Sequence, residues 1–274
     1  MKSSFLVLLF LLSSLLGFSS ERDQQLNALK NKIAEKKALV VHVMIPLCDN
    51  KYQGIVPVND QLGDGTNLNT NLYWGAGYGF RSYFKLKTDW KLVHKIANHS
   101  STVLERVAFT KTIGSTRVIM VGDAFRGDQM KDCLRQFTYA LAGKKKDSVN
   151  IPNLGTIQLG SDADLLIFSG HNGLMDDTLH IPEPIDNKER EAMVIACYSD
   201  SYFQPLLKKL KTYPLITTSG LLAPEAYVMH AGIEAWAKLK TANEIRIACG
   251  DAYYAKHPSS TQGGCRNLFR TGIR

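Results

Sequence analysis

The chain has 274 residues, of which 45% are hydrophobic, and its 33 Lys and Arg residues outnumber 25 Asp and Glu to give a formal net charge of +8. That length allows one α/β domain with a substantial core, or two small ones. The densest basic run, GKKKD at 143–147, is typical of a solvated loop. We therefore expect a soluble protein that has no nucleic-acid partner.

Residues 1–20, MKSSFLVLLFLLSSLLGFSS, have the layout of a secretory signal peptide. Lys2 precedes an apolar stretch from Phe5 to about Leu16, and small residues follow it. The apolar stretch is shorter than the roughly 20 residues that cross a bilayer. We expect cleavage, a secreted or periplasmic protein, and no stable membrane insertion after signal cleavage.

The remaining chain contains five cysteines and shows no CxxC spacing or Cys/His ligand cluster. They are Cys48, Cys133, Cys197, Cys249 and Cys265. The absence of ligand spacing disfavours a structural zinc site. An odd count in an oxidising compartment leaves at least one thiol without a partner in the same chain, and a Cys249–Cys265 bridge is one possible pairing.

Taken in chain order, residues 21–37 predict a charged N-terminal helix, and residues 38–274 predict one domain. The continuous apolar run 38–48 predicts a strand that is buried on both faces. A polar loop at 59–71 follows, and then a glycine-containing helix at 72–84 that would pack closely on a sheet.

Further apolar runs predict five more strands, at 116–124, 163–170, 192–197, 214–220 and 244–249. Helical periods separate them, beginning near Asp128, near Ser201 and at Pro224. Alternation of strands and helices is typical of a mostly parallel sheet that is covered on both faces. The sequence therefore predicts an α/β fold with about six mostly parallel strands and helices on both faces.

Two neighbouring strand ends carry groups that could form a catalytic site. In open parallel sheets, ligands bind beyond the carboxyl ends of the strands. His171 follows the strand DLLIFSG and Cys197 closes the strand AMVIAC. If these strands are adjacent, the imidazole and the thiol lie side by side. Cys249 ends a similar run, IRIAC, but no histidine-tipped strand precedes it, so we expect a structural thiol there.

The chemistry of the pair is that of an activated nucleophile. A neighbouring imidazole or a helix N-terminus favours the thiolate, which is the reactive form of cysteine. Asn172 and Gly173 form a tight turn after His171, where a backbone N–H could face a developing oxyanion. The N–H of Cys197 itself is the second candidate donor.

The segments LLIFSGHNG and MVIAC together resemble the caspase–gingipain–legumain clan of cysteine peptidases, over about residues 116–240. The resemblance implies a caspase-like three-layer sandwich and hydrolysis of peptide bonds in a peptide or protein substrate. By the same similarity His171 is the base, Cys197 the nucleophile, and Gly173 lends an oxyanion donor. No cofactor is required.

Two other functions remain open at this point. His171, Asp176 or Asp177, and His180 could ligate a metal ion for hydrolysis. Alternatively, the chain is a non-catalytic caspase-like protein that binds a partner in the bacterial envelope, because a fold does not fix a function.

Overall fold

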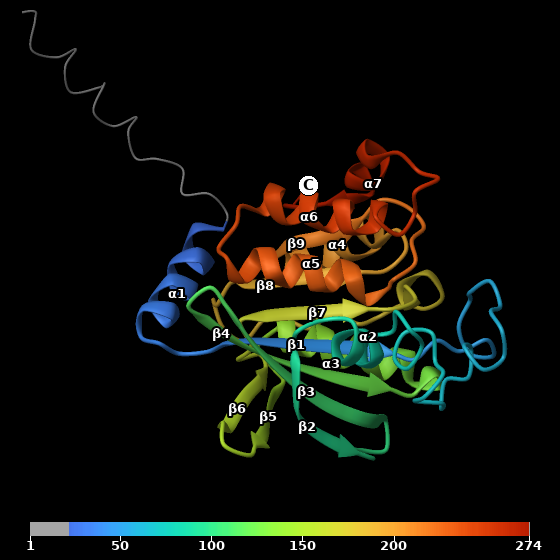
Figure 1. Cartoon of the computed structure of the whole chain (residues 1–274), viewed down its shortest axis with the longest axis horizontal. Coiled ribbons are helices and arrows are strands. Elements are labelled where there is room, and N and C mark those ends of the chain that lie inside the picture. The colour runs from blue at the N-terminus through green and yellow to red at the C-terminus, as the bar shows by residue number, and fades with distance from the viewer. Residues whose placement is uncertain (1–21, 274) are drawn as a thin grey trace, which may run out of the picture.

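The computed structural model describes residues 22–273. An eight-stranded mixed sheet lies at the centre of the fold (Figure 1). The predicted signal peptide, residues 1–20, lies outside the described residues. The strand order is β10-β9-β8-β7-β1-β4-β3-β2. The strands are β1 (Leu39–Pro46), β2 (Lys91–Ala97), β3 (Val103–Ile113), β4 (Thr116–Phe125), β7 (Leu165–Ser169), β8 (Arg190–Ile195), β9 (Thr212–Thr218) and β10 (Phe269–Arg270).

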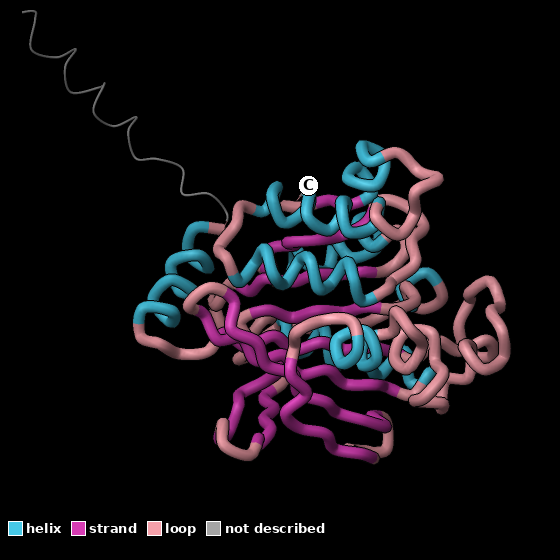
Figure 2. The backbone as a smooth tube through the Cα atoms, viewed as in Figure 1, coloured by secondary structure: helices cyan, strands magenta, loops and turns pink. Residues whose placement is uncertain are grey.

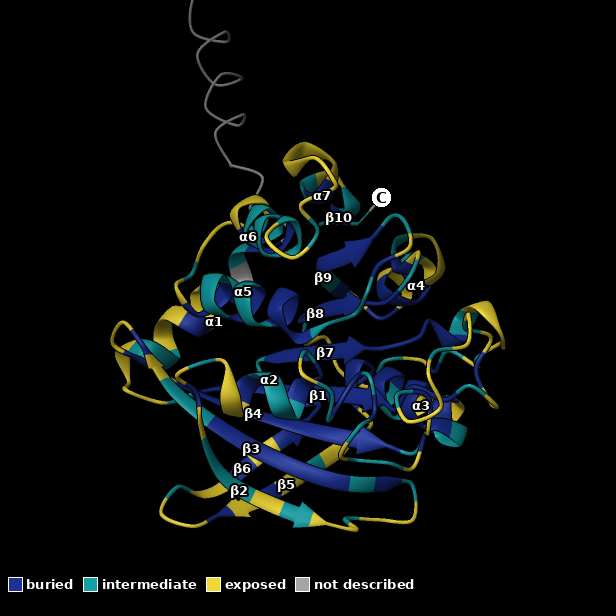
Figure 3. Ribbon diagram, turned by 45° about the vertical axis from the view of Figure 1, so that its right-hand side comes forward, coloured by how far each residue is buried: buried dark blue, intermediate teal, exposed yellow. Residues whose placement is uncertain are grey.

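The five central strands run parallel, and antiparallel strands complete both edges of the sheet. β4, β1, β7, β8 and β9 pair in parallel, while β3 and β2 extend one edge and β10 the other in antiparallel register. The predicted strands at 38–48, 116–124, 163–170, 192–197 and 214–220 correspond to these central strands. Their continuous apolar sequences fit because both faces are covered (Figure 3).

Helices cover both faces of the sheet and make a layered α/β arrangement. The helices are α1 (Asp23–Ala34), α2 (Phe80–Leu86), α3 (Met130–Leu141), α4 (Ser199–Lys209), α5 (Ala226–Ala237), α6 (Ala242–Tyr254) and α7 (Gln262–Leu268). α2, α5 and α6 pack on one face, and α3 and α4 on the other. A two-stranded hairpin, β5 (Lys146–Ile151) and β6 (Gly155–Gly160), joins the α3 side. No described helix is both long and apolar enough to cross a bilayer.

Two sequence-based element assignments are wrong. The run 244–249 is not a strand but part of α6, which begins after a capping box formed by Thr241 and Glu244. Ile245 and Cys249 are buried with helical i, i+4 spacing, so the run is one face of a helix. At 72–84, the helix α2 begins only at Phe80, and residues 72–79 form turns and bends. The glycine at position 75 permits a close backbone approach there, since a Cβ would lie 2.3 Å from the Leu68 carbonyl oxygen.

A buried network of charges joins β1, β3, β4 and β5. The Arg106 guanidinium donates to the Asp123 carboxylate at 2.6 and 2.7 Å and to Asp147 Oδ2 at 2.7 Å. The His42 Nε2 atom lies 3.0 Å from Asp123 Oδ2, and its Nδ1 accepts the Gly160 N–H. Because each charge has a partner, charged residues occupy interior positions of β3 and β4.

Candidate active site

His171 and Cys197 follow the carboxyl ends of β7 and β8 and therefore lie at the same end of the sheet. The two strands are parallel neighbours, with Ser169 opposite Ile195, and the Gly170 N–H donates to the Ile195 carbonyl at 3.1 Å. Both side chains line the same open cavity of about 400 Å³. In Figure 1 the arrowhead of β7 points to this end of the sheet, and Figure 2 shows that the segments gathered there are loops. The predicted adjacency of the two strands is therefore confirmed.

The imidazole of His171 is buried and is held by a carboxylate. Its Nε2 atom lies 2.6 Å from Asp176 Oδ2, and the side chain is only 6% exposed. The same Asp176 oxygen accepts the Gly54 N–H at 3.0 Å, which ties the loop after β1 to this histidine. From the sequence, Asp176 was a candidate only as a metal ligand. Its place five residues after His171 in the same turn is the signal that could have suggested the pairing.

Cys197 differs from the other cysteines in its exposure. All five cysteines are free thiols, so the possible Cys249–Cys265 bridge is not formed. Cys197 is partly exposed and the other four are buried. Burial raises the pKa of Cys48 to about 11 and that of Cys249 to about 12, which keeps those thiols protonated. The Cys197 Sγ donates to the Leu222 carbonyl at 3.5 Å, toward the loop after β9.

A strained turn connects Cys197 to α4. Tyr198 has φ 50° and ψ 27°, a left-handed conformation that costs an ordinary L-residue roughly 1–2 kcal/mol. The Tyr198 N–H donates to the Gly220 carbonyl at 2.9 Å, and the Ser199 hydroxyl donates to the Val194 carbonyl at 2.8 Å. These bonds hold the turn so that Cys197 directly precedes the N-terminus of α4. Strained backbone held in this way is concentrated at functional sites.

Asn172 and Gly173 position the two strand ends from inside the turn. Asn172 is fully buried, and its Nδ2 donates to the Cys197 carbonyl at 2.7 Å while its Oδ1 accepts the Leu174 N–H. The dihedral angles of Asn172, φ −82° and ψ 86°, fit an inverse γ-turn in which the Gly173 N–H donates to the His171 carbonyl at 3.1 Å. That N–H is thus engaged within the turn rather than directed to an incoming oxyanion.

The cavity beside Cys197 is built by loops that are distant in sequence. Residues 54–56 follow β1, Met175 follows β7, and Leu221, Leu222 and Pro224 follow β9. Tyr73 and Tyr253 also line it. Burial raises the pKa of the Tyr73 phenol well above its usual value. None of these lining residues could be assigned from sequence, because only the tertiary fold brings their loops together.

The structure does not gather the metal set that the sequence allowed. Within residues 22–273, the groups of three or more metal-ligating side chains with donor atoms within 4.8 Å are His42, Asp123 and Asp147, and Asp89, His230 and Glu234. His180 is not grouped with His171 and Asp176. The first group is occupied by the Arg106 guanidinium, and in the second Lys111 Nζ lies 2.6 Å from Asp89 and 2.5 Å from Glu234.

The comparisons with known proteins identify no relative. No protein-family model, curated protein or solved structure matches this chain. The geometry of the site is therefore the basis for a functional proposal.

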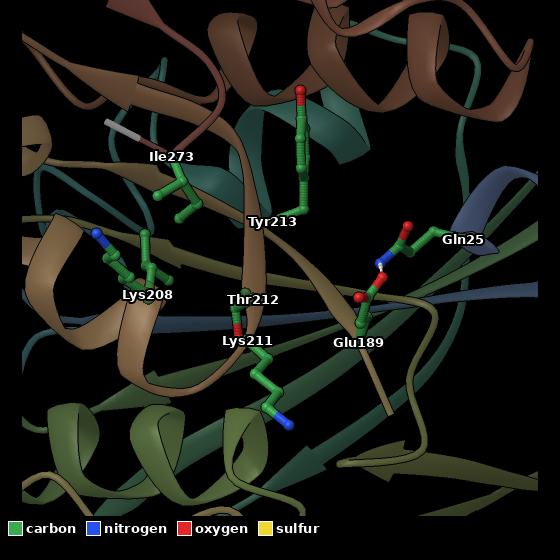
Figure 4. Close-up of a pocket in the computed structure, with 8 residues that line it drawn as sticks. Gln25, Glu189, Lys208, Lys211, Thr212, Tyr213 and Ile273 are labelled. Atoms are coloured by element: carbon green, nitrogen blue, oxygen red, sulfur yellow. Dashed lines mark hydrogen bonds between the residues drawn. The ribbon is translucent and has the colours of Figure 1, made fainter. Parts of the chain in front are cut away.

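A second cavity, of about 220 Å³, lies at the opposite end of the strands, where β9 begins at Thr212 (Figure 4). Gln25 Nε2 donates to Glu189 Oε2 at 2.7 Å on one side of it, and Lys208 and Lys211 lie on another. Among the described residues that line it, no nucleophile is paired with a base, and we assign the candidate active site to the end of the sheet that bears Cys197.

Proposed function

We propose that this protein is a secreted or periplasmic cysteine peptidase of caspase-like architecture, which hydrolyses peptide bonds through Cys197 and His171. The observation that carries the proposal is the meeting of a partly exposed thiol and a carboxylate-paired imidazole in one cavity, at the carboxyl ends of adjacent parallel strands. The leader-like sequence of residues 1–20 supports the location.

The first step forms the nucleophile. With its Nε2–H donated to Asp176, His171 presents Nδ1 as the nitrogen that takes the proton from Cys197 Sγ. The thiolate forms close to the N-terminus of α4, whose partial positive charge favours an anion there. Asp176 fixes the tautomer of the ring and stabilises the resulting imidazolium.

In the second step, the thiolate attacks the carbonyl carbon of the peptide bond and the carbonyl electrons move onto oxygen. We assign the N–H of Cys197 as a donor to that oxyanion, since Gly173 donates within its own turn. Collapse expels the amine, which takes the proton from the imidazolium and leaves a thioester on Sγ. Water then attacks the thioester with His171 as base, which releases a carboxylic acid and restores the thiol.

The experiment compares matched cysteine variants of the purified protein on a library of internally quenched peptides. Cys197→Ala should abolish cleavage, and His171→Ala should reduce it to background. Cys249→Ala is the control, because Cys249 ends the same Ile-Ala-Cys sequence but is buried in α6. Cleavage that persists in Cys197→Ala, or that a chelator abolishes and a divalent ion restores, would refute the proposal.

A further inference from the structure

We propose that the cavity beside Cys197 selects a large apolar, uncharged side chain in the residue on the acyl side of the cleaved bond. This inference rests on the proposed function and adds to it the class of substrate. It predicts cleavage after residues such as Leu or Phe, and not after Asp, Asn, Lys or Arg.

The chemistry of the cavity lining favours an apolar side chain. Apart from His171, the side chains that line the cavity in the described chain are uncharged. Ile55, Leu222 and Pro224 offer hydrocarbon surface. Of the two phenols, the Tyr73 side chain is buried, and the Tyr253 hydroxyl accepts the Ala223 N–H at 3.4 Å. The nearest charged groups, His171 and Asp176, are paired with each other, so a charged substrate side chain would lose its hydration without gaining a free opposite charge. An apolar side chain gains burial instead.

The position of the Cys197 thiol determines which substrate residue lies nearest to the cavity. Cys197 Sγ lies in the wall and is directed to the Leu222 carbonyl, beside the loop that follows β9. During the reaction the acyl half of the substrate stays bonded to Sγ, while the amine half leaves. The side chain nearest to Sγ is therefore that of the acyl residue. The cavity volume of about 400 Å³ is within the range of roughly 300–1,000 Å³ that is usual for ligand sites.

Exposed apolar side chains also surround the cavity. Most of the large hydrophobic side chains that are exposed in the described chain lie here, namely Val56, Met175, Tyr198, Tyr202 and Leu221. Met175 lines both this cavity and a second one, beside Tyr198 and Tyr202. Exposed apolar patches of this kind are typical of binding sites, and this one would hold further apolar residues of the same substrate.

The test uses fluorogenic peptides that differ only in the acyl residue, which is Leu, Phe, Asp or Lys. We expect kcat/KM to be about 100-fold higher for Leu and Phe than for Asp and Lys, because an unpaired charge is costly to bury. Leu221→Lys should lower the preference for Leu over Asp by at least about fivefold, since it adds a cation at the rim. Leu86→Lys is the matched control, because Leu86 is as exposed as Leu221 but ends α2.

A second measurement does not depend on turnover. Peptidyl chloromethyl ketones with Leu or Lys as the acyl residue should label Cys197 at different rates, with Leu faster, as followed by intact mass. Cys197-dependent cleavage that favours Asp or Lys would overturn the apolar selectivity but leave the peptidase proposal standing. Faster labelling by the Leu reagent without any peptide hydrolysis would support the selectivity and overturn the peptidase. Equal labelling by both reagents would overturn the selectivity.

Discussion

From the hydrogen bond between Asp176 and His171 we predict how far the activity falls when the Asp176 charge is removed. Asp176→Asn keeps the size of the side chain but removes the charge that faces His171 Nε2 at 2.6 Å. A hydrogen bond to a charged group contributes about 1.5–3 kcal/mol. Because the Asp176 side chain is 35% exposed, solvent screens the interaction, and we take the lower part of that range, about 1.5–2 kcal/mol. At about 1.36 kcal/mol per tenfold change in rate, kcat/KM falls about 10–30-fold.

The assay is steady-state hydrolysis of a fluorogenic peptide, with kcat and KM measured separately. Since Asp176 acts through His171 rather than on the substrate, the loss should lie in kcat while KM changes little. Asp177→Asn is the matched control, because the Asp177 carboxylate pairs with Lys131 Nζ at 2.9 Å and does not contact His171. Wild-type kcat in Asp176→Asn, or an equal loss in Asp177→Asn, would refute the positioning role of Asp176.

Four further predictions concern the thiols, the buried charges and the turn. Iodoacetamide should add a single group to the native protein, at Cys197, because the other cysteines are buried; peptide mapping by mass spectrometry measures this. Burial alone raises the pKa of Asp123, but Arg106 and His42 outweigh it and hold that pKa well below its usual value, so this stabilisation is present at neutral pH and is lost as the pH falls below about 3.9. Arg106→Met should lower the free energy of unfolding at pH 7 by about 3–5 kcal/mol, because it leaves a buried carboxylate without its main partner; urea denaturation measures it. Gly173→Ala should destabilise by about 1–3 kcal/mol, because its Cβ would lie 2.5 Å from the Met130 Cγ.

Matched variants separate these effects from general sensitivity to substitution. Arg135→Met removes an exposed ion pair with Asp132 and should cost less than about 1 kcal/mol. Gly77→Ala places a Cβ in open space and should change the stability by no more than about 0.5 kcal/mol. Alkylation of a buried cysteine before Cys197, constant stability between pH 7 and pH 3, or equal effects in the matched variants would each contradict the corresponding argument.

The sequence does not predict the strands that contain buried charged residues or that alternate irregularly between polar and apolar residues. β3 contains Glu105 and Arg106 at buried positions, which local hydrophobicity does not identify as a core strand. Their burial depends on partners elsewhere in the chain, such as Asp123 and Trp74. The apolar residues of 244–249 alone predict a strand, whereas Thr241 and Glu244 have the spacing of a helix cap.

The five central strands, and the positions of His171 and Cys197 at strand ends, follow from the sequence alone. Continuous apolar runs predict such strands because a parallel sheet needs both faces buried, and ligands bind beyond the carboxyl ends of its strands. The groups around the Cys197 thiol depend instead on the tertiary structure. The pairing of Asp176 with His171, the mostly apolar cavity and the burial of the other four cysteines arise because segments far apart in the sequence meet when the chain folds.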